Sequence, residues 1–301
     1  MEYMQEVNIL PNQNLNIDYL RRAAKENEVL CSKALVYERG IGLRFNLGGY
    51  EAIMPTDEVS FLPDGTSVKE AAIVTRINKN VCFVIKLVDE GGNEPVFYIS
   101  RRLAQKQAYD NYINHLRVGD IIPCCVTHID SFGVFCDIAY GISALLPIDF
   151  ISISRIQTPA DRFEVGQNIY VCIKSIDPSG RIVLSHKELL GSWLENAQMF
   201  CAQSTCAGVV RSIEDYGIFI ELMPNLAGLA ENCEGIQVGD VVNVYIKSIL
   251  PDKMKIKLVI MSTLKNTDYA VQVKYFISQG HISRWRYSTD NSVKLIETVF
   301  E

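Results

Sequence analysis

The chain has 301 residues, of which 48% are hydrophobic and 21% are charged, and its formal net charge is −6. This length and composition fit a globular protein of two or three small domains. The acidic balance argues against nucleic-acid binding through phosphate attraction alone, which needs a clearly basic surface. No apolar run approaches the ~20 residues that cross a bilayer, and the first residues lack the features of a secretion signal. Nine cysteines without a Cys-x-x-Cys pair favour a reduced, cytoplasmic protein with no membrane partner.

The first hundred residues predict an arm, a helix and a β domain. Residues 1–15 show little pattern and are expected to form a mobile arm. The next residues, up to 28, predict a short amphipathic helix, because Ile17 and Leu20 fall on one side of it. Strand-like runs follow between residues 29 and 101, and one of them is Ala71–Ile77.

The middle of the chain predicts a small antiparallel barrel. Residues 102–116 are polar and helix-favouring, so we expect a connecting helix there. From Ile121 to Ser185 five runs of Val, Ile and Phe at strand spacing are separated by Gly or Pro, which is typical of such a barrel. Pro178-Ser179-Gly180 supplies the last turn, because Gly tolerates the positive φ that other residues resist.

A related pattern recurs further along. Residues 187–204 predict a second connecting helix, since Leu190, Trp193 and Ala197 form an apolar stripe. Residues 205–262 then repeat the barrel pattern, which together with the preceding helix indicates an internal repeat. The repeated motifs are Phe132-Gly133-Val134-Phe135 with Tyr216-Gly217-Ile218-Phe219, and Ile173-Lys174-Ser175-Ile176 with Ile246-Lys247-Ser248-Ile249.

The last residues, 263–301, do not continue the repeat. Three runs there predict strands, at Gln272–Ile277, Ile282–Tyr287 and Val293–Phe300. The segment holds too many aromatic residues for a solvated tail. We therefore expect a small β appendage packed on the third barrel.

The central stretch resembles the S1-type RNA-binding domain, an OB-fold module. The marks that carry this resemblance are Val118-Gly119-Asp120, the Phe132-Gly133-x-Phe135 core, Val165-Gly166-Gln167 and the closing Gly180-Arg181-Ile182-Val183-Leu184-Ser185. The resemblance extends over about residues 29–262 and is least complete in the first copy, where only Arg39, Gly40 and Leu43 stand near the aromatic positions.

This resemblance implies a mainly β fold of three tandem five-stranded OB barrels, joined by short helices and followed by the β appendage. The expected domains are an N-terminal arm and short helix (1–28), a divergent barrel (29–101), a connecting helix (102–116), a second barrel (117–186), another connecting helix (187–204), a third barrel (205–262) and the appendage (263–301).

Two aromatic pairs are the main candidates for a binding site. In a regular strand Phe132 and Phe135 would face opposite sides, so one ring would enter the core. If the chain turns at Phe132-Gly133, both rings lie on the outer face and present platforms for two unstacked bases, and the resemblance favours this interpretation. Base stacking contributes about 1–3 kcal/mol per base. Tyr216 and Phe219 form the second pair, in more acidic surroundings.

Six further residues are candidate RNA contacts. The resemblance places Arg181 and Lys255 beside the platforms, where they would meet phosphate or a base edge. A solvated cation at the end of a strand is an equally good interpretation of each. Pro147 and Glu231 stand where the family often has a His, which predicts weak binding per domain. The remaining candidates are His128 for a base or sugar, Lys174 and Lys247 for phosphate, and Asp161, which could equally form a surface ion pair with Arg162.

The residues predict no catalytic site, cofactor or small-molecule substrate. Dense carboxylate clusters, a Ser-His-Asp order and a phosphate-cradling Gly loop are all missing from the sequence. The one grouping with metal-ligand chemistry is Cys201, Cys206, Cys233 and His281, whose spacing fits no common zinc pattern, so we predict no metal site.

We therefore expect a non-enzymatic protein that binds single-stranded RNA by stacking. The layout resembles a short member of the bacterial ribosomal proteins that carry this domain, which implies a role in translation, with messenger RNA and the small ribosomal subunit as partners. The first barrel, poor in aromatics, is a candidate for docking protein. One alternative is a regulator of gene expression or RNA decay that does not reside on ribosomes. Another is a protein-interaction scaffold, which the acidic balance favours and the retained aromatic pairs oppose.

Overall fold

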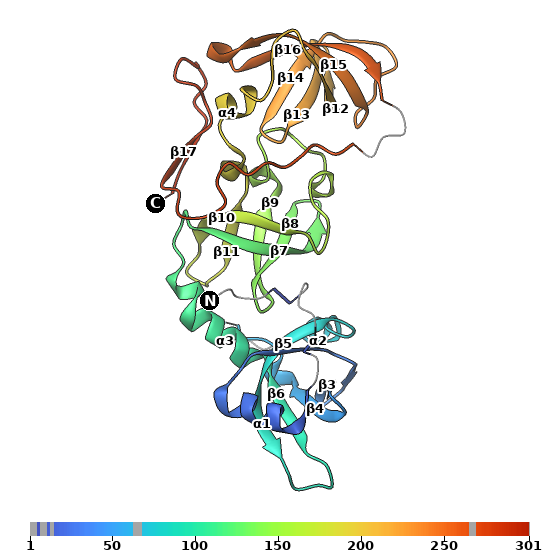
Figure 1. Cartoon of the computed structure of the whole chain (residues 1–301), viewed down its shortest axis with the longest axis vertical. Helices are drawn as coiled ribbons and strands as arrows, with labels where there is room; N and C mark the ends of the chain where they lie inside the picture. The colour runs from blue at the N-terminus through green and yellow to red at the C-terminus, as the bar shows by residue number, and fades with distance from the viewer. Residues whose placement is uncertain (1–4, 7–10, 13–14, 63–67, 265–268, 301) are drawn as a thin grey trace.

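The computed structural model describes residues 5–6, 11–12, 15–62, 68–264 and 269–300. Three β modules follow one another along the long axis, and the C-terminal segment (residues 269–300) runs back along the third and the central module (Figure 1). None of the described helices has the length and apolarity that a membrane span needs.

The first module combines a six-stranded sheet with two helices. Helix α1 begins after Asn16, whose side chain accepts a hydrogen bond from the Tyr19 backbone, and ends at Asn27 in the left-handed region. The sheet order is β1-β5-β6-β4-β3-β2. The elements are α1 (Ile17–Glu26), β1 (Leu30–Lys33), β2 (Val36–Glu38), β3 (Gly42–Leu47), β4 (Tyr50–Pro55), a 3-10 turn (Thr56–Glu58), α2 (Glu70–Val74), β5 (Asn80–Asp89) and β6 (Val96–Ser100).

A divergent five-stranded barrel is expected here, and the structure has a six-stranded sheet in its place. The first strand is split, because the Ala34 backbone N–H bonds to Lys79 whereas that of Leu35 bonds to Arg44. As a result β1 pairs only with β5 and β2 only with β3. The predicted strand at Ala71–Ile77 is also wrong: helix α2 stands there, since two alanines favour a helix and the free side of β5 is already occupied by β1.

The central and third modules are closed five-stranded barrels, as predicted, with strand orders β10-β11-β9-β8-β7 and β12-β13-β14-β16-β15. Alternate strand residues such as Val134 and Cys136 fill each interior. The central strands are β7 (Ile121–Asp130), β8 (Gly133–Ala139), β9 (Ile142–Pro147), β10 (Asn168–Ile176) and β11 (Ile182–Ser185), with 3-10 turns at Ile148–Phe150 and Pro159–Asp161. The third-barrel strands are β12 (Thr205–Glu214), β13 (Gly217–Met223), β14 (Leu226–Ala230), β15 (Val241–Leu250) and β16 (Lys255–Thr263), with a 3-10 turn at Pro251–Lys253.

Two connections join the modules, and the second is not the continuous helix that was predicted. Between the first two modules lie α3 (Arg101–Asn111) and a 3-10 turn (Ile113–His115). Between the barrels a 3-10 turn (Lys187–Leu190) ends at Gly191, whose φ is +78°, and α4 (Trp193–Ala197) starts anew from a Ser192 capping box. The break lets Leu189 and Trp193 both enter the third-barrel core.

The expected mobile N-terminal arm is wrong for the described residues of that stretch. Glu6 is buried, and its carboxylate lies 2.7 Å from Nε of Arg101. The Asn12 side chain accepts a hydrogen bond from the Cys31 backbone, and Leu15 belongs to the first core. The side chains of Glu6 and Asn12 thus hold the arm against α3 and the first module.

The C-terminal segment differs from the expected appendage in two ways. Gln272–Ile277 is not a strand, and β17 (Arg284–Arg286) and β18 (Glu297–Val299) form a two-stranded sheet. The segment also contacts both barrels and not the third alone. Ile282, Trp285, Tyr287 and Phe300 belong to the core cluster of the third barrel. The Ile121 backbone of the central barrel bonds to Gly280, and Gly119 bonds to Ile282.

Candidate nucleic-acid interface

The first aromatic pair lies at the turn between β7 and β8 of the central barrel. Register places His128 opposite Phe135, and their ring centroids lie 6.1 Å apart with 29° between the planes. Phe132, in the turn itself, packs edge-on against Phe135, with centroids 5.9 Å apart at 88°. Phe132 is 50% exposed, whereas the neighbouring Val134 is fully buried. Both phenyl rings and His128 therefore lie on the outer face.

The third barrel repeats this geometry. Tyr216 lies in the turn between β12 and β13 and packs edge-on against Phe219, with centroids 6.0 Å apart at 89°. Tyr216 is 70% exposed, more than Phe132. Ser212 stands opposite Phe219, where the central barrel has His128. Edge-to-face contact fixes the two rings of each pair against each other.

The strand register places further residues level with Phe135 and Phe219 on the neighbouring strands. We call each such line of residues an aromatic row. Phe135 lies opposite Leu145, which is level with Val183, and Phe219 lies opposite Leu229, which is level with Lys257. Lys257 is thus the exposed cation in the row of Phe219. It was missed in the sequence analysis, although its place two residues after Lys255 puts it on the same strand face.

The structure does not bring Arg181 to the aromatic row. Arg181 precedes Val183 by two residues and so lies one step further along the barrel, away from Phe132. There it lines a groove of about 310 Å³ together with Arg76 and Tyr109 of the neighbouring segments. Lys255 occupies the corresponding place in the third barrel, next to Ala227 in the lining of a larger groove.

Lys174 and Lys247 each lie at a β-bulge, where the register skips one residue. A bulged residue leaves the regular alternation of the strand. The Lys174 ammonium lies 5.1 Å from the ring centroid of Phe300 in the C-terminal segment, so it is not brought to the platform. Lys247 is exposed.

Asp161 caps a short turn and does not pair with its neighbour Arg162. Its carboxylate accepts the backbone N–H groups of Gln157 and Thr158 at 3.0 and 3.3 Å. It also lies 3.5 Å from the Arg211 guanidinium of the third barrel. Its observed contacts are those of a structural residue between the barrels.

A buried carboxylate stands two residues after each inner aromatic residue. Glu221, after Phe219, is fully buried and binds Arg162 of the central barrel and Arg211, the latter at 2.6 Å. Asp137, after Phe135, is likewise buried and accepts the backbone N–H groups of Glu6 and Gly141 at 2.7 and 2.9 Å. Burial, together with the charge of Glu6, raises the pKa of Asp137 to about 7.

These carboxylates mark where each barrel meets the module before it. Arg101 of α3 bonds to Gly141 beside Asp137, and Arg162 of the central barrel reaches Glu221. One end of each outer face is therefore covered by residues that precede the barrel in the chain. The sequence contained a signal for this contact, because both repeats have an acidic residue two positions after the inner aromatic residue.

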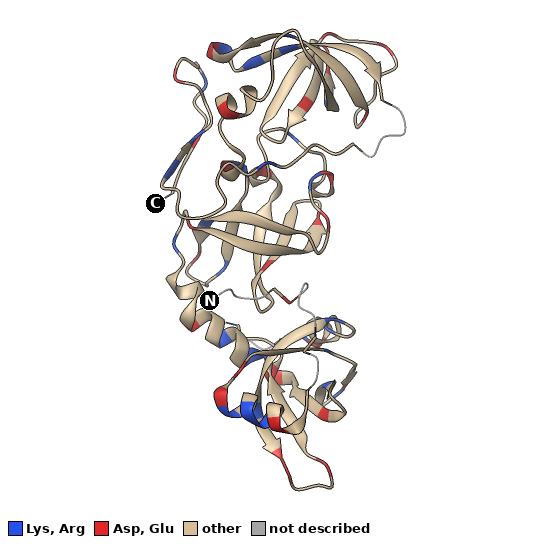
Figure 2. Ribbon diagram, viewed as in Figure 1, with Lys and Arg blue, Asp and Glu red and all other residues tan. Residues whose placement is uncertain are grey.

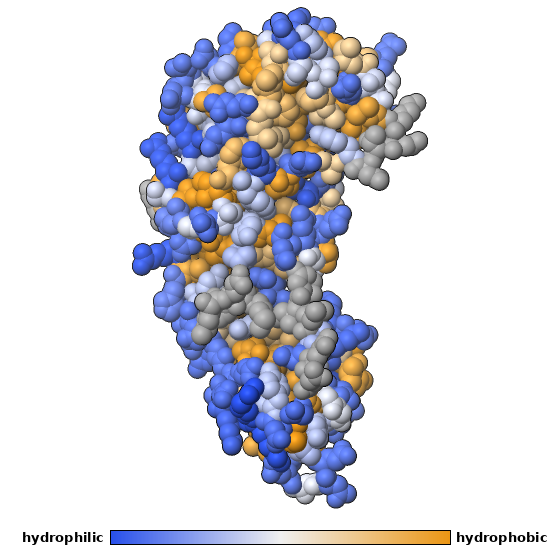
Figure 3. Space-filling view, viewed as in Figure 1, coloured by the Kyte–Doolittle hydropathy of each residue, from blue (hydrophilic) through white to orange (hydrophobic). Residues whose placement is uncertain are grey.

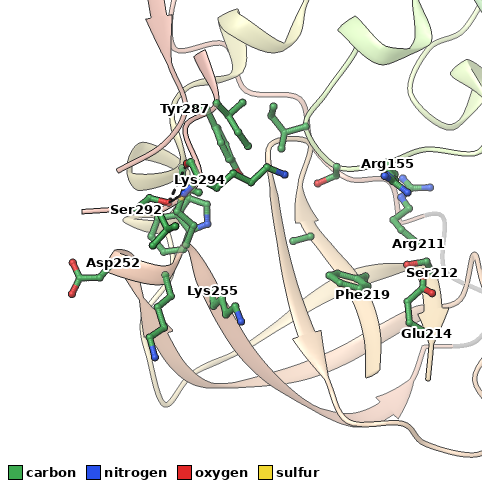
Figure 4. A pocket seen from close by; sticks show the side chains of 18 of the residues that line it. Arg155, Arg211, Ser212, Glu214, Phe219, Asp252, Lys255, Tyr287, Ser292 and Lys294 are labelled. Carbon is green, nitrogen blue, oxygen red and sulfur yellow. Dashed lines mark hydrogen bonds between the residues drawn. The ribbon is translucent and has the colours of Figure 1, made fainter. Parts of the chain in front are cut away.

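A groove of about 760 Å³ adjoins the second aromatic pair. Tyr216 and Phe219 line it, together with residues of the central barrel and of the C-terminal segment. Arg155 and Lys294 lie on opposite sides of the groove, and Phe219 and Lys255 lie below them in this view, on the strands of the third barrel (Figure 4). Elsewhere Lys and Arg alternate with Asp and Glu on all three modules (Figure 2), and apolar residues reach the surface between them (Figure 3).

The four residues with metal-ligand chemistry do not assemble. His281 binds the Asp120 carboxylate at 2.8 Å, and Cys201 and Cys233 are exposed. In the part of the chain that the structure describes, no group of three or more His, Cys, Asp or Glu side chains is placed to hold a metal ion.

A closed five-stranded barrel of this kind is the architecture of the OB fold. The family model of the S1 RNA binding domain matches residues 115–187, so the chain contains an S1-type domain. Curated relatives are similar over most of the chain. The small ribosomal subunit protein bS1 of Staphylococcus aureus strain COL is 28% identical over 269 residues, which cover 83% of this chain and 66% of the relative.

Two further likenesses complete the comparison. The bS1 protein of Leuconostoc lactis is 28% identical over 250 residues, covering 77% of this chain and 56% of that protein. The chain thus spans less than two thirds of the length of these relatives. A solved multidomain protein with nucleic acid binding domains from Streptococcus pneumoniae is 12% identical, with 78% and 73% of the two chains covered and a TM-score of 0.25. That score is too low to support a common overall arrangement.

Proposed function

We propose that this chain binds single-stranded RNA without catalysing a reaction, as a cytoplasmic protein that associates with messenger RNA and the small ribosomal subunit. The observation that carries the proposal is the pair of exposed rings at the same turn of two barrels. Aromatic faces attract any unpaired base, at about 1–3 kcal/mol per base, and this attraction needs little net charge. It therefore suits a chain whose net charge is −6.

The test is a titration of a fluorescent single-stranded RNA of about 30 nucleotides, long enough to reach both barrels, onto the wild type, Phe132→Ala/Phe135→Ala and Tyr216→Ala/Phe219→Ala. Each pair removes two stacks, so we expect at least about a tenfold loss of affinity. Leu87→Ala is the control, because Leu87 is an apolar side chain of the first module that is 58% exposed. Equal binding of duplex and single strand by the wild type would contradict the stacking mechanism.

A regulator of RNA that does not reside on ribosomes is the second candidate. The same exposed ring pairs would serve it, because stacking on an unpaired base does not require the ribosome. Sedimentation of a cell lysate through a sucrose gradient separates the two: migration with the small subunit supports the ribosomal role, and migration with free RNA supports the regulator.

A further inference from the structure

We infer that the principal single-strand site of this chain is the composite groove beside Tyr216 and Phe219, and that Arg155 and Lys294 are its phosphate-binding residues. The inference rests on the proposed RNA binding and names the site and the residues that dominate it. It places the stacking rings and Lys294 outside the segment that the S1 family model matches, residues 115–187, and takes Arg155 from within that segment.

The groove is built from three parts of the chain. The third barrel supplies Tyr216, Phe219 and Lys255, the central barrel supplies Ile153 to Arg155, and the C-terminal segment supplies Ser292 to Lys294. Its volume of about 760 Å³ lies within the ~300–1,000 Å³ that is usual for ligand sites. The aromatic rings therefore form one side of a cavity and not an open surface.

The charge of this groove is opposite to that of the chain. Five cations line it, against the two carboxylates of Glu214 and Asp252. Arg211 is neutralised by Glu221, at 2.6 Å. Among the described residues, none forms an ion pair with Arg155, Lys253, Lys255 or Lys294. Unpaired cations next to stacking rings are what a single strand with its phosphates requires. The five cations are Arg155, Arg211, Lys253, Lys255 and Lys294.

Both flanking walls are fixed to the third barrel by hydrogen bonds. On the central-barrel side, the backbone N–H of Ile153 donates to Asn225 Oδ1 at 3.0 Å, and that of Ser154 donates to Pro224 at 3.0 Å. Arg155 follows directly. A wall that is already in place lowers the ordering cost of binding.

The wall formed by the C-terminal segment is fixed in the same way. The Tyr287 hydroxyl donates to the Asn225 carbonyl at 2.6 Å, and the Thr289 hydroxyl donates to the Pro251 carbonyl at 3.0 Å. Lys294 lies on the hairpin that these bonds anchor. Its own side chain is exposed, so its substitution does not remove a core contact.

The grooves described beside the central barrel do not reach its rings. Two smaller grooves, of about 500 and 310 Å³, lie where it meets the first module, and they include Ser143 but neither Phe132 nor Phe135. These grooves join no cation to Phe132 or Phe135, whereas the groove of the third barrel joins Arg155, Lys255 and Lys294 to Tyr216 and Phe219. The third barrel is therefore expected to bind a single strand more tightly.

The experiment compares Arg155→Ala/Lys294→Ala with Lys25→Ala/Lys106→Ala in the full-length chain. The control makes the same change of charge at two exposed lysines of the first module and of α3. With fluorescent oligouridylate, the groove variant should bind about tenfold more weakly and the control less than about twofold. The slope of log affinity against log salt should also fall by about 1.4 in the groove variant, since each lost phosphate contact of a single strand contributes about 0.7.

The same titration separates this inference from the proposed function. A groove variant that matches the control in affinity and in salt slope would overturn the inference while wild-type binding still supports the function. A loss in Tyr216→Ala/Phe219→Ala no greater than that in Phe132→Ala/Phe135→Ala would also overturn it. Failure of the wild type to bind single-stranded RNA would remove both.

Discussion

His186 is one of the residues through which the central barrel holds the C-terminal segment. It is fully buried, with Nδ1 2.9 Å from the Ile151 carbonyl oxygen and Nε2 3.0 Å from the Tyr275 hydroxyl. A carbonyl only accepts, so the neutral ring donates from Nδ1 and accepts the Tyr275 proton at Nε2. Burial lowers the pKa of His186 to about 4, and the charge of Arg162 adds to this effect.

The buried imidazole predicts a loss of stability in acid. Its folded pKa of about 4 lies below the ordinary value of about 6.5, so the unfolded chain binds the proton first. The stabilisation is present above pH 6.5 and is lost as the pH falls toward 4, at about 2 kcal/mol between pH 7 and pH 5. Urea unfolding at both pH values should show this difference for the wild type and a much smaller one for His186→Gln.

Asp137 provides a background of opposite sign in the same experiment. Its folded pKa, about 7, is raised, so its contribution to stability falls as the pH rises from about 4 to 7. Glu6, Arg101 and Arg76 surround this carboxyl and are unchanged in the variant. The comparison between wild type and His186→Gln therefore isolates the imidazole. Equal pH dependence of the two proteins would contradict the neutral, buried state of His186.

At the scale of elements, the break at Gly191 decides how the barrels are joined. A Cβ at Gly191 would lie 2.7 Å from the ring of Phe276, which belongs to the C-terminal segment. The Phe276 backbone N–H also donates to the Leu189 carbonyl at 2.9 Å. One short connection thus turns the chain, fills the third core and receives the returning segment.

Gly191→Ala should destabilise the chain more than Gly235→Ala. The two glycines have nearly the same φ, +78° and +80°, but a Cβ at Gly235 meets no atom within 4 Å. Both substitutions carry the strain of a positive φ, about 1 kcal/mol or more. Only Gly191→Ala must also displace Phe276, which we expect to cost a further 1–3 kcal/mol or so. Thermal unfolding of the two variants measures this difference, and equal melting temperatures would show that Phe276 is not held there.

At the scale of the whole molecule, the C-terminal segment joins the central and the third barrel through contacts with both. Residues of the segment contribute to the core cluster of the third barrel and bond to the central barrel at Gly119 and Ile121. Two binding surfaces held in a fixed relation raise the effective concentration of the second contact after the first has formed.

Binding should therefore depend strongly on RNA length. An oligouridylate of about 6 nucleotides fits within the ~4–16 nucleotides that one OB fold covers, whereas one of about 30 can reach both barrels. We expect the long strand to bind at least about 100-fold more tightly. Phe132→Ala/Phe135→Ala should cancel most of this gain and leave the short strand nearly unaffected. A length series by fluorescence anisotropy measures both effects, and a gain that survives the substitution would argue against two linked sites.

The sequence by itself determined the barrels and the places of the rings. Alternation of apolar residues and turn chemistry are local properties, and Phe132, Phe135, Tyr216 and Phe219 stand at equivalent points of a repeat. Local patterns were misleading where contacts between modules set the conformation. The apolar stripe after residue 187 was therefore interpreted as one helix, and the buried Glu6 as part of a mobile arm.

Only the tertiary structure decided which residues share a site. Arg155, Phe219 and Lys294 are far apart in the sequence, and no periodicity relates them. They meet because Glu221 is buried against Arg162 at one side of the third barrel, and Tyr287 bonds to Asn225 at the other. These long-range contacts fix the position of each wall, so the groove follows from the packing of three segments and not from the pattern of any one of them.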